Sequence, residues 1–361
     1  MAADCSVVPT STPSNSGIAG AGVLLSFIIT AAVALSISAV LVFSDTWGRA
    51  ARQRKASGSS SASTSSFAII GRKLLNSYSD QQIVTGIGIQ SLGLSQISSL
   101  VPYHFFLIWM LGLLSTAVHN AALLALVHDF RRDWVLRWLR QALMFVNLAL
   151  SCIYGIFVLR ELAAGLPQTL PMVCALESGV PKNTTIATGD GKGDTTAAWS
   201  GSAGAFQFIA TVAVVAGNCV VFILSTWYLH SRAQRFYRIV QLVGLALMAA
   251  VAIGVAVRIV LLSQAFGHPS VSLSDVGETQ WSFGQLLSLL MLLLPLISVV
   301  EIARGEIKVA PPVQDDGSGH GGSGDTVPLV EHQLPMGKAG HTSFQPTPFF
   351  SSSSRRTNSG R

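Results

Sequence analysis

Long apolar stretches alternate with short polar segments along this chain, and seven stretches are long enough to cross a bilayer. The hydrocarbon layer is about 30 Å thick, so a spanning helix needs roughly 20 mostly apolar residues. The predicted spans are Gly17–Phe43, Gln82–Val101, Tyr103–Val127, Leu139–Leu159, Gly204–Leu229, Ile239–Leu262 and Phe283–Val300. The pattern predicts an all-α polytopic membrane protein built as a seven-transmembrane-helix bundle.

The composition also indicates that hydrocarbon, and not water, surrounds most of this chain. Of its 361 residues, 50% are hydrophobic and only 11% are charged, whereas soluble domains carry about 25% charged residues. The first apolar stretch follows no basic residue and is too long for a cleaved signal peptide, so we expect it to stay as the first span. The bilayer is therefore the first expected partner.

The positions of the basic residues predict the orientation. Short cytoplasmic loops are enriched in Lys and Arg. Such residues follow the first, third, fifth and seventh stretches, at Arg49, Arg52, Arg54, Lys55, Arg72, Lys73, Arg131, Arg132, Arg137, Arg140, Arg232, Arg235, Arg238, Arg304 and Lys308. The N-terminal tail and the Ser263–Gln280 loop have none. This asymmetry predicts an N-terminus outside and a cytoplasmic C-terminus, and it accounts for the net charge of +6 without nucleic acid as a partner.

A glycosylation sequon supports the same orientation. Asn183-Thr184-Thr185 lies in the long polar segment between the fourth and fifth stretches, and an acceptor asparagine must face the lumen. We therefore expect an outer loop glycosylated at Asn183, and a plasma membrane location.

Three regions follow from the pattern. Residues 1–16 are an extracellular tail, residues 17–304 a seven-helix membrane domain, and residues 305–361 a disordered cytoplasmic tail without apolar periodicity. Ser57 and Ser359 follow basic residues as basophilic kinases prefer, and regulation by phosphorylation competes there with a chance match.

The four cysteines support no metal site. Cys5 and Cys174 are both predicted outside, where a bridge between them and two free thiols are both open. Cys152 and Cys219 fall inside spans as packing residues. No CxxC pair or His/Cys ligand spacing occurs, so neither a metal nor a cofactor is predicted. The eight histidines are scattered, which disfavours a metal-dependent membrane enzyme.

Ionisable and polar residues within spans are costly, and each needs a reason. His119 and Asn120, with Ser115 one turn earlier, are candidates for ligand contact or proton sensing. The competing interpretation is a neutral imidazole bonded to a neighbouring helix. Arg258 has the same two interpretations, because an arginine near a span end can also extend to the headgroups.

Two spans carry structural signals. The second is rich in polar residues, including Gln82, Gln90 and Ser91, so we expect it inside the bundle. Asp80 stands where an N-cap would begin it, and Gly86 would permit close helix approach. Pro295 is expected to kink the seventh span.

Two blocks carry a family resemblance. The first is Tyr78-Ser79-Asp80-Gln81-Gln82-Ile83-Val84-Thr85-Gly86, and the second combines Tyr103-His104 with the run from Ser115 to Leu123. Together they resemble a family of multispan integral membrane proteins of filamentous fungi with no assigned activity. The second block departs from the family pattern at Val118, where threonine is expected, and at Asn120, where leucine is expected. The resemblance implies location and architecture, and it singles out Asp80, Gln81, Gln82, Gly86, His104 and His119.

Three functions fit a protein of this topology. A receptor-like sensor, signalling to cytosolic partners through basic inner loops and the tail, is the leading hypothesis. A transporter or channel would need charged residues along a path or an internal repeat. The spans offer one histidine expected to be buried, His119, a peripheral arginine, Arg258, and no convincing repeat. A membrane scaffold that recruits cytosolic partners is the third. Topology alone does not choose among them.

Overall fold

The computed structural model describes residues 5, 8–54, 66–130, 134–164, 166–175, 202–231, 236–269 and 271–304. Their helices are α1 Ser16–Ala19, α2 Ala21–Arg54, α3 Ser66–Ser95, α4 Pro102–Ala125, α5 Val127–Phe130, α6 Trp134–Ala164, η1 Met172–Ala175, α7 Ser202–His230, α8 Tyr237–Leu262, α9 Phe283–Met291 and α10 Leu294–Ala303. Within these ranges, the β contact is one isolated bridge between Thr12 and Leu273. The all-α prediction is confirmed for this part of the chain.

Five helical segments are long and apolar enough to cross a membrane. They are Ser16–Trp47, Pro102–Ala125, Arg137–Ala163, Ala205–His230 and Tyr237–Leu262. The chain is thus a multi-pass integral membrane protein. The other two predicted spans differ: α3 has 30 residues but is more polar, and the last one is a shorter apolar segment, Phe283–Ile297.

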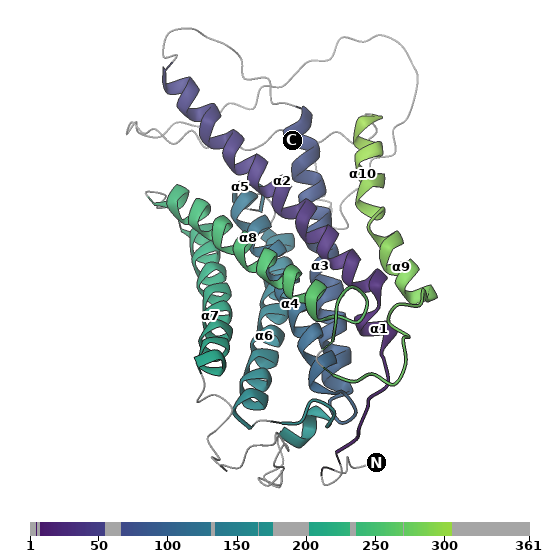
Figure 1. Cartoon of the computed structure of the whole chain (residues 1–361). Coiled ribbons are helices and arrows are strands. Elements are labelled where there is room, and N and C mark those ends of the chain that lie inside the picture. Colours follow the sequence, from purple (N-terminus) through teal and green to yellow (C-terminus); the bar gives the residue numbers. More distant parts are fainter. Residues whose placement is uncertain are drawn as a thin grey trace, which may run out of the picture. The chain divides into compact units, whose positions relative to one another are not determined.

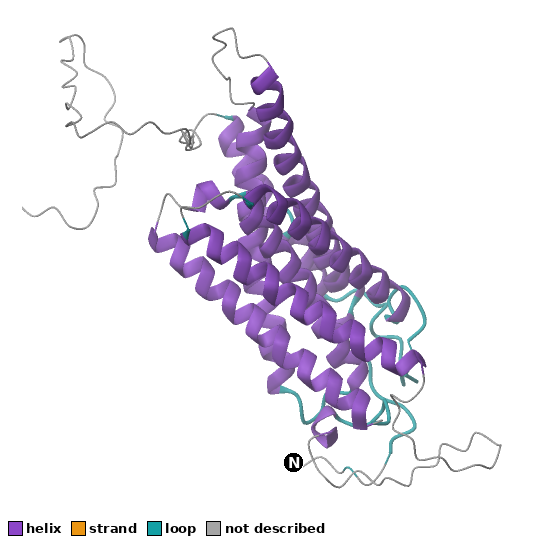
Figure 2. Cartoon of the chain, turned by 90° about the vertical axis from the view of Figure 1, so that its left-hand side faces the viewer, coloured by secondary structure: helices purple, strands orange, loops and turns teal. Residues whose placement is uncertain are grey.

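Contacts at the helix ends show that the long helices alternate in direction (Figures 1 and 2). We call one end of the bundle the cap end; it holds residues 8–15, 97–101, 166–175 and 263–282. There the Met172 and Val173 amides, after α6, donate to the Leu100 and Ile97 carbonyls after α3. The other end, which we call the arginine end, holds Arg72 at the start of α3 and Arg140 at the start of α6.

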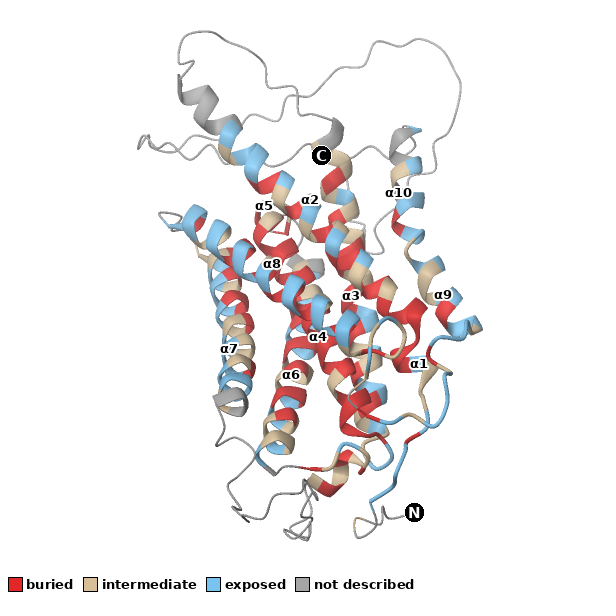
Figure 3. Ribbon diagram, viewed as in Figure 1, coloured by how far each residue is buried: buried red, intermediate tan, exposed pale blue. Residues whose placement is uncertain are grey.

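Helix α4 lies at the centre of the bundle. It contacts α2, α3, α6, α7 and α8, and all of its residues except Phe106 and Ala125 are buried (Figure 3). By contrast α7 and α8 expose apolar side chains such as Ile223 at 62% and Ile253 at 65%. Side chains of this kind need hydrocarbon as their solvent, so these two helices face lipid.

One face of α3 is buried, as its polar composition predicted, and the other is not. Gln82, Gly86 and Gln90 face inward, whereas Thr85, Ser91 and Ser95 are exposed. The Thr85 and Ser95 hydroxyls donate to carbonyls of their own helix, Gln81 at 2.9 Å and Leu92 at 2.6 Å. This backbone bonding lets them lie outside the core without an unpaired donor.

The seventh predicted span is interrupted rather than one kinked helix. Helix α9 ends at Met291 and α10 begins at Leu294, with Pro295 in its first turn. Proline has no amide hydrogen and its ring clashes with the preceding turn, so it is tolerated at a helix start and not in a helix interior. The expected kink is therefore a break at residues 292–293.

Candidate functional site

The cap end is assembled from segments far apart in the sequence. Cys5 and Cys174 form a disulfide across 169 residues. The Thr12 amide donates to the Ser272 carbonyl at 3.1 Å, and the Ser274 amide donates to the Thr12 carbonyl at 2.9 Å. The N-terminal tail is therefore fixed both to the segment after α6 and to the loop between α8 and α9.

A buried acid joins that loop to the central helix. The Tyr103 hydroxyl donates to one carboxylate oxygen of Glu278 at 2.8 Å, and His104 Nε2 lies 2.8 Å from the other. Glu278 is 0% and His104 3% exposed. A buried carboxylate is costly unless it is paired and hydrogen bonded. His104 is the partner that can supply the compensating charge, so we name Tyr103, His104 and Glu278 the cap cluster.

The backbone around the cap cluster is held in place as well. The Gln264 amide, after α8, donates to the Tyr103 hydroxyl at 2.9 Å. The Ala21 amide at the start of α2 donates to the Glu278 carbonyl at 3.2 Å. A displacement of Glu278 would thus act on α2, α4 and α8 together.

A second polar group lies among α3, α4 and α6, in the middle of the bundle. Gln90 Nε2 donates to Asn147 Oδ1 at 2.8 Å, and Asn147 Nδ2 donates to the Thr116 hydroxyl at 3.2 Å. The Ser115 hydroxyl donates to the Gln82 carbonyl at 2.6 Å. Gly86 makes room, since a Cβ there would lie 2.4 Å from Ser115 Oγ. Interhelical hydrogen bonds of this kind fix the register of neighbouring helices.

His119 and Asn120 lie one turn further along α4. Both are fully buried. Neither ring nitrogen of His119 has a hydrogen-bond partner among the described residues, nor does Asn120 Oδ1. Asn120 Nδ2 donates to the Asn218 carbonyl at 3.5 Å. Within the described residues, His119 is therefore not the helix-bonded imidazole that was one of its two predicted roles. A neutral ring is compatible with its burial.

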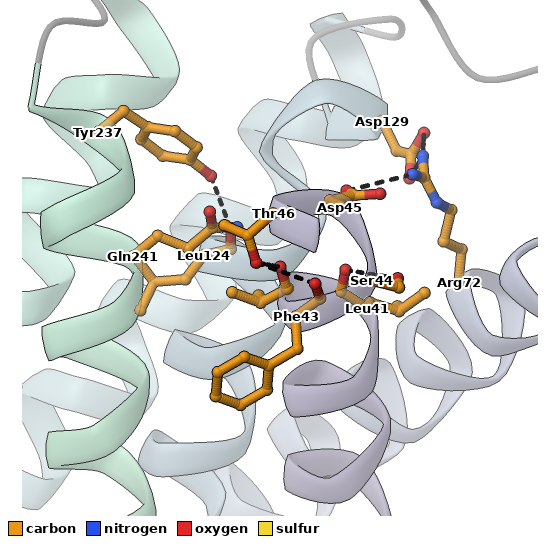
Figure 4. Close-up of polar contacts among 11 residues, drawn as sticks. Leu41, Phe43, Ser44, Asp45, Thr46, Arg72, Leu124, Asp129, Tyr237 and Gln241 are labelled. Carbon is orange, nitrogen blue, oxygen red and sulfur yellow. Dashed lines mark hydrogen bonds and ion pairs between the residues drawn. The ribbon is translucent and has the colours of Figure 1, made fainter. Parts of the chain in front are cut away.

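At the arginine end, ion pairs connect the helix ends (Figure 4). Arg72 on α3 lies 3.3 Å from Asp129 on α5 and 3.7 Å from Asp45 on α2. The Leu124 carbonyl, in the last turn of α4, accepts from Tyr237 at 2.6 Å and Gln241 at 2.9 Å, both on α8. Both ends of α4 are thus bonded to α8 or its following loop.

The remaining candidates lie apart from these groups. Asp80 is inside α3 and pairs with Arg140 through two bonds of 2.9 and 2.7 Å, so its prediction as an N-cap is wrong, because α3 already begins at Ser66. Gln81 Oε1 has no partner within the described residues. Arg258 is exposed on α8, which fits extension toward headgroups. Asn183, Ser57, Ser359 and the predicted tail 305–361 lie outside the described residues.

Sequence reasoning missed Glu278 and gave Tyr103 and Arg72 no role at a site. Glu278 stands in a polar loop 174 residues from His104, and an acid in a loop is ordinarily solvated. One signal was present. The Ser263–Gln280 loop has no Lys or Arg, so an acid buried in this loop must pair with a histidine or with a side chain from another helix.

Comparisons with known protein families, curated proteins and solved structures find no match to this chain. The site itself is therefore the basis for inferring a function. Within the described residues, no group of three His, Cys, Asp or Glu side chains is arranged to hold a metal ion. The arrangement instead joins a buried acid–histidine pair at the cap end to ion pairs at the arginine end through one buried helix.

Proposed function

We propose that this chain is a seven-span membrane protein with its cap end outside and its arginine end in the cytosol. Alternation of the helix ends supports passage of α3 and of α9–α10 through the same layer as the five apolar helices. The basic residues at the arginine end support the orientation. The plasma membrane and a glycosylated Asn183 are part of this proposal, as is kinship with the fungal multispan family.

We further propose that the protein is a receptor-like sensor. The observation that carries this is the position of α4, which is buried along its length and bonded at both ends. Packed interiors deform little, so a shift imposed on α4 at the cap cluster is transmitted to its other end rather than absorbed. A stimulus outside would thereby change the inner surface that cytosolic partners contact.

Hydrogen exchange measured by mass spectrometry in lipid nanodiscs tests this transmission. Glu278→Gln removes the charge of the cap cluster without removing its bulk. We expect faster exchange both in residues 263–282 and at the arginine end, in α5 and the first turn of α8. His268→Gln is the matched control, because His268 is an exposed ionisable side chain in the same loop. Changes confined to residues 263–282 in Glu278→Gln would contradict the coupling.

Signalling itself is tested with membranes that contain the protein and a heterotrimeric G protein. A variant that loosens the cap cluster does not need the natural stimulus, so Glu278→Gln should change basal nucleotide exchange while His268→Gln should not. If both variants show the nucleotide exchange of the wild type, and deletion of residues 305–361 removes the cellular phenotype, the protein is a scaffold and not a sensor.

Transport is the second candidate, favoured by His119 in the middle of the bundle, whose ring nitrogens have no hydrogen-bond partner in the part of the chain that the structure describes. Intramembrane ionisable groups often mark proton or ion paths. Proton flux into liposomes, followed with an internal pH-sensitive dye, separates the two functions. The sensor predicts no flux above that of empty liposomes, whereas flux that His119→Ala abolishes would establish transport.

A further inference from the structure

The inner end of α7 carries a groove on its lipid-facing side. Its described lining is Phe222, Ile223, Thr226, Trp227, His230 and Ser231, and it encloses about 510 Å³. Ile223 and Trp227 are 62% and 69% exposed. A volume of this size is typical of small-molecule sites, and exposed apolar walls suit an acyl chain better than water.

The groove becomes polar toward the arginine end. The Thr226 hydroxyl is buried and has no hydrogen-bond partner among the described residues. His230 Nδ1 lies 3.0 Å from the Thr226 carbonyl, which makes Nδ1 the protonated nitrogen of this contact. The Trp138 ring packs 5.3 Å from the His230 ring. These two contacts hold the His230 ring in one orientation. The contact with the Thr226 carbonyl uses Nδ1 and does not involve Nε2.

The charge around this end has one sign. Residues 195–274 contain no Asp or Glu, while Arg232, Arg235 and Arg238 follow α7 directly in the sequence. Tyr237 packs 5.6 Å from Tyr228, so the first turn of α8, with the exposed Arg238, lies beside the last turns of α7. An anion at the polar end of the groove would therefore meet no competing acid on α7 or α8, and the described cation on the neighbouring first turn of α8 is Arg238.

We propose that this groove binds an anionic phospholipid. One acyl chain lies along Ile223 and Trp227, and the phosphate accepts from the Thr226 hydroxyl and lies beside the His230 ring, with Arg238 adding charge. Basic pockets beside membrane helices on the cytoplasmic side bind anionic headgroups. A phosphatidylcholine also brings a phosphate, but its choline cation would face the arginines. The site is independent of the sensor function.

Native mass spectrometry of the purified full chain tests the proposal, with equimolar phosphatidylglycerol and phosphatidylcholine added in detergent. Each basic group near a membrane surface favours an anionic lipid by roughly fivefold. We expect the wild type to retain phosphatidylglycerol over phosphatidylcholine by at least about fivefold. Thr226→Val combined with His230→Gln should remove most of that preference, whereas the matched control His268→Gln, in an exposed cap-end loop, should keep it.

Two outcomes would overturn the site. Equal retention of both lipids by the wild type would mean that the groove holds only unselected bilayer lipid. An unchanged preference in the double variant would place anionic lipid elsewhere. If the double variant fails to fold, Arg238→Gln serves instead, since this exposed side chain lies outside the groove lining; it should lower the preference without abolishing it, and no change would again contradict the proposal.

Discussion

Two glycines on α3 show how much the surroundings of a residue determine its role. A Cβ added at Gly86 would lie 2.4 Å from Ser115 Oγ and 2.8 Å from Asn147 Oδ1, whereas one at Gly88 would meet nothing within 4 Å. Gly86→Ala should destabilise the protein by about 1–3 kcal/mol, because it forces α3 away from α4 and α6. The measurement is the melting temperature in detergent.

Gly88→Ala is the control for that substitution. It adds the same methyl group to the same helix, and the better helix propensity of alanine should leave stability unchanged or raise it by up to about 1 kcal/mol. Equal melting temperatures for the two variants would show that α3 does not pack closely at Gly86.

Asp275 gives a pH prediction at the cap end. Hydrogen bonds from the Ser14 hydroxyl and the Gly277 amide hold the pKa of Asp275 below its ordinary value. A lowered pKa in the folded state means that the stabilisation is complete at neutral pH and is lost as the pH falls through that pKa. Asp275→Asn should therefore melt lower than the wild type at neutral pH, with the gap closing in acid once the Asp275 carboxyl is protonated. A gap that persists in acid would contradict this assignment.

The sequence predicted single residues unevenly. It singled out His104 by resemblance and His119 and Asn120 by their cost in a membrane, and all three are buried in the structure. The sequence did not predict which residues surround these three side chains. The partner of His104 is Glu278, and only the fold brings an acid from a distant loop against the start of α4.

At the scale of elements, the cap end depends on one covalent connection. The Cys5–Cys174 disulfide leaves Cys152 and Cys219 as free thiols. Denatured but unreduced protein should therefore react with iodoacetamide at two positions, and reduced protein at four, as counted by intact mass. Four labelled cysteines without reduction would show that the bridge is absent from the purified protein.

Long apolar stretches in the sequence predicted the spanning helices well where tertiary packing does not impose a different arrangement. Five of the seven predicted spans correspond to long apolar helices. The other two depend on tertiary contacts: α3 keeps polar Gln82 and Gln90 because α4 and α6 cover them. The break before Pro295 follows from the missing amide of proline, but its place at residues 292–293 could not be read from the apolar pattern, which continues through both halves.

For the whole molecule, the central claim is that the chain crosses the membrane seven times with the cap end outside. Impermeant maleimide labelling of intact cells tests it, using single cysteines introduced into a chain without Cys152 and Cys219. Ser98→Cys, in the exposed turn between α3 and α4, and Val276→Cys, in the cap-end loop, should be labelled in intact cells. Ser57→Cys and Ser318→Cys should be labelled only after permeabilisation. If positions 57 and 98 are labelled under the same condition, α3 does not cross the membrane and the account is wrong.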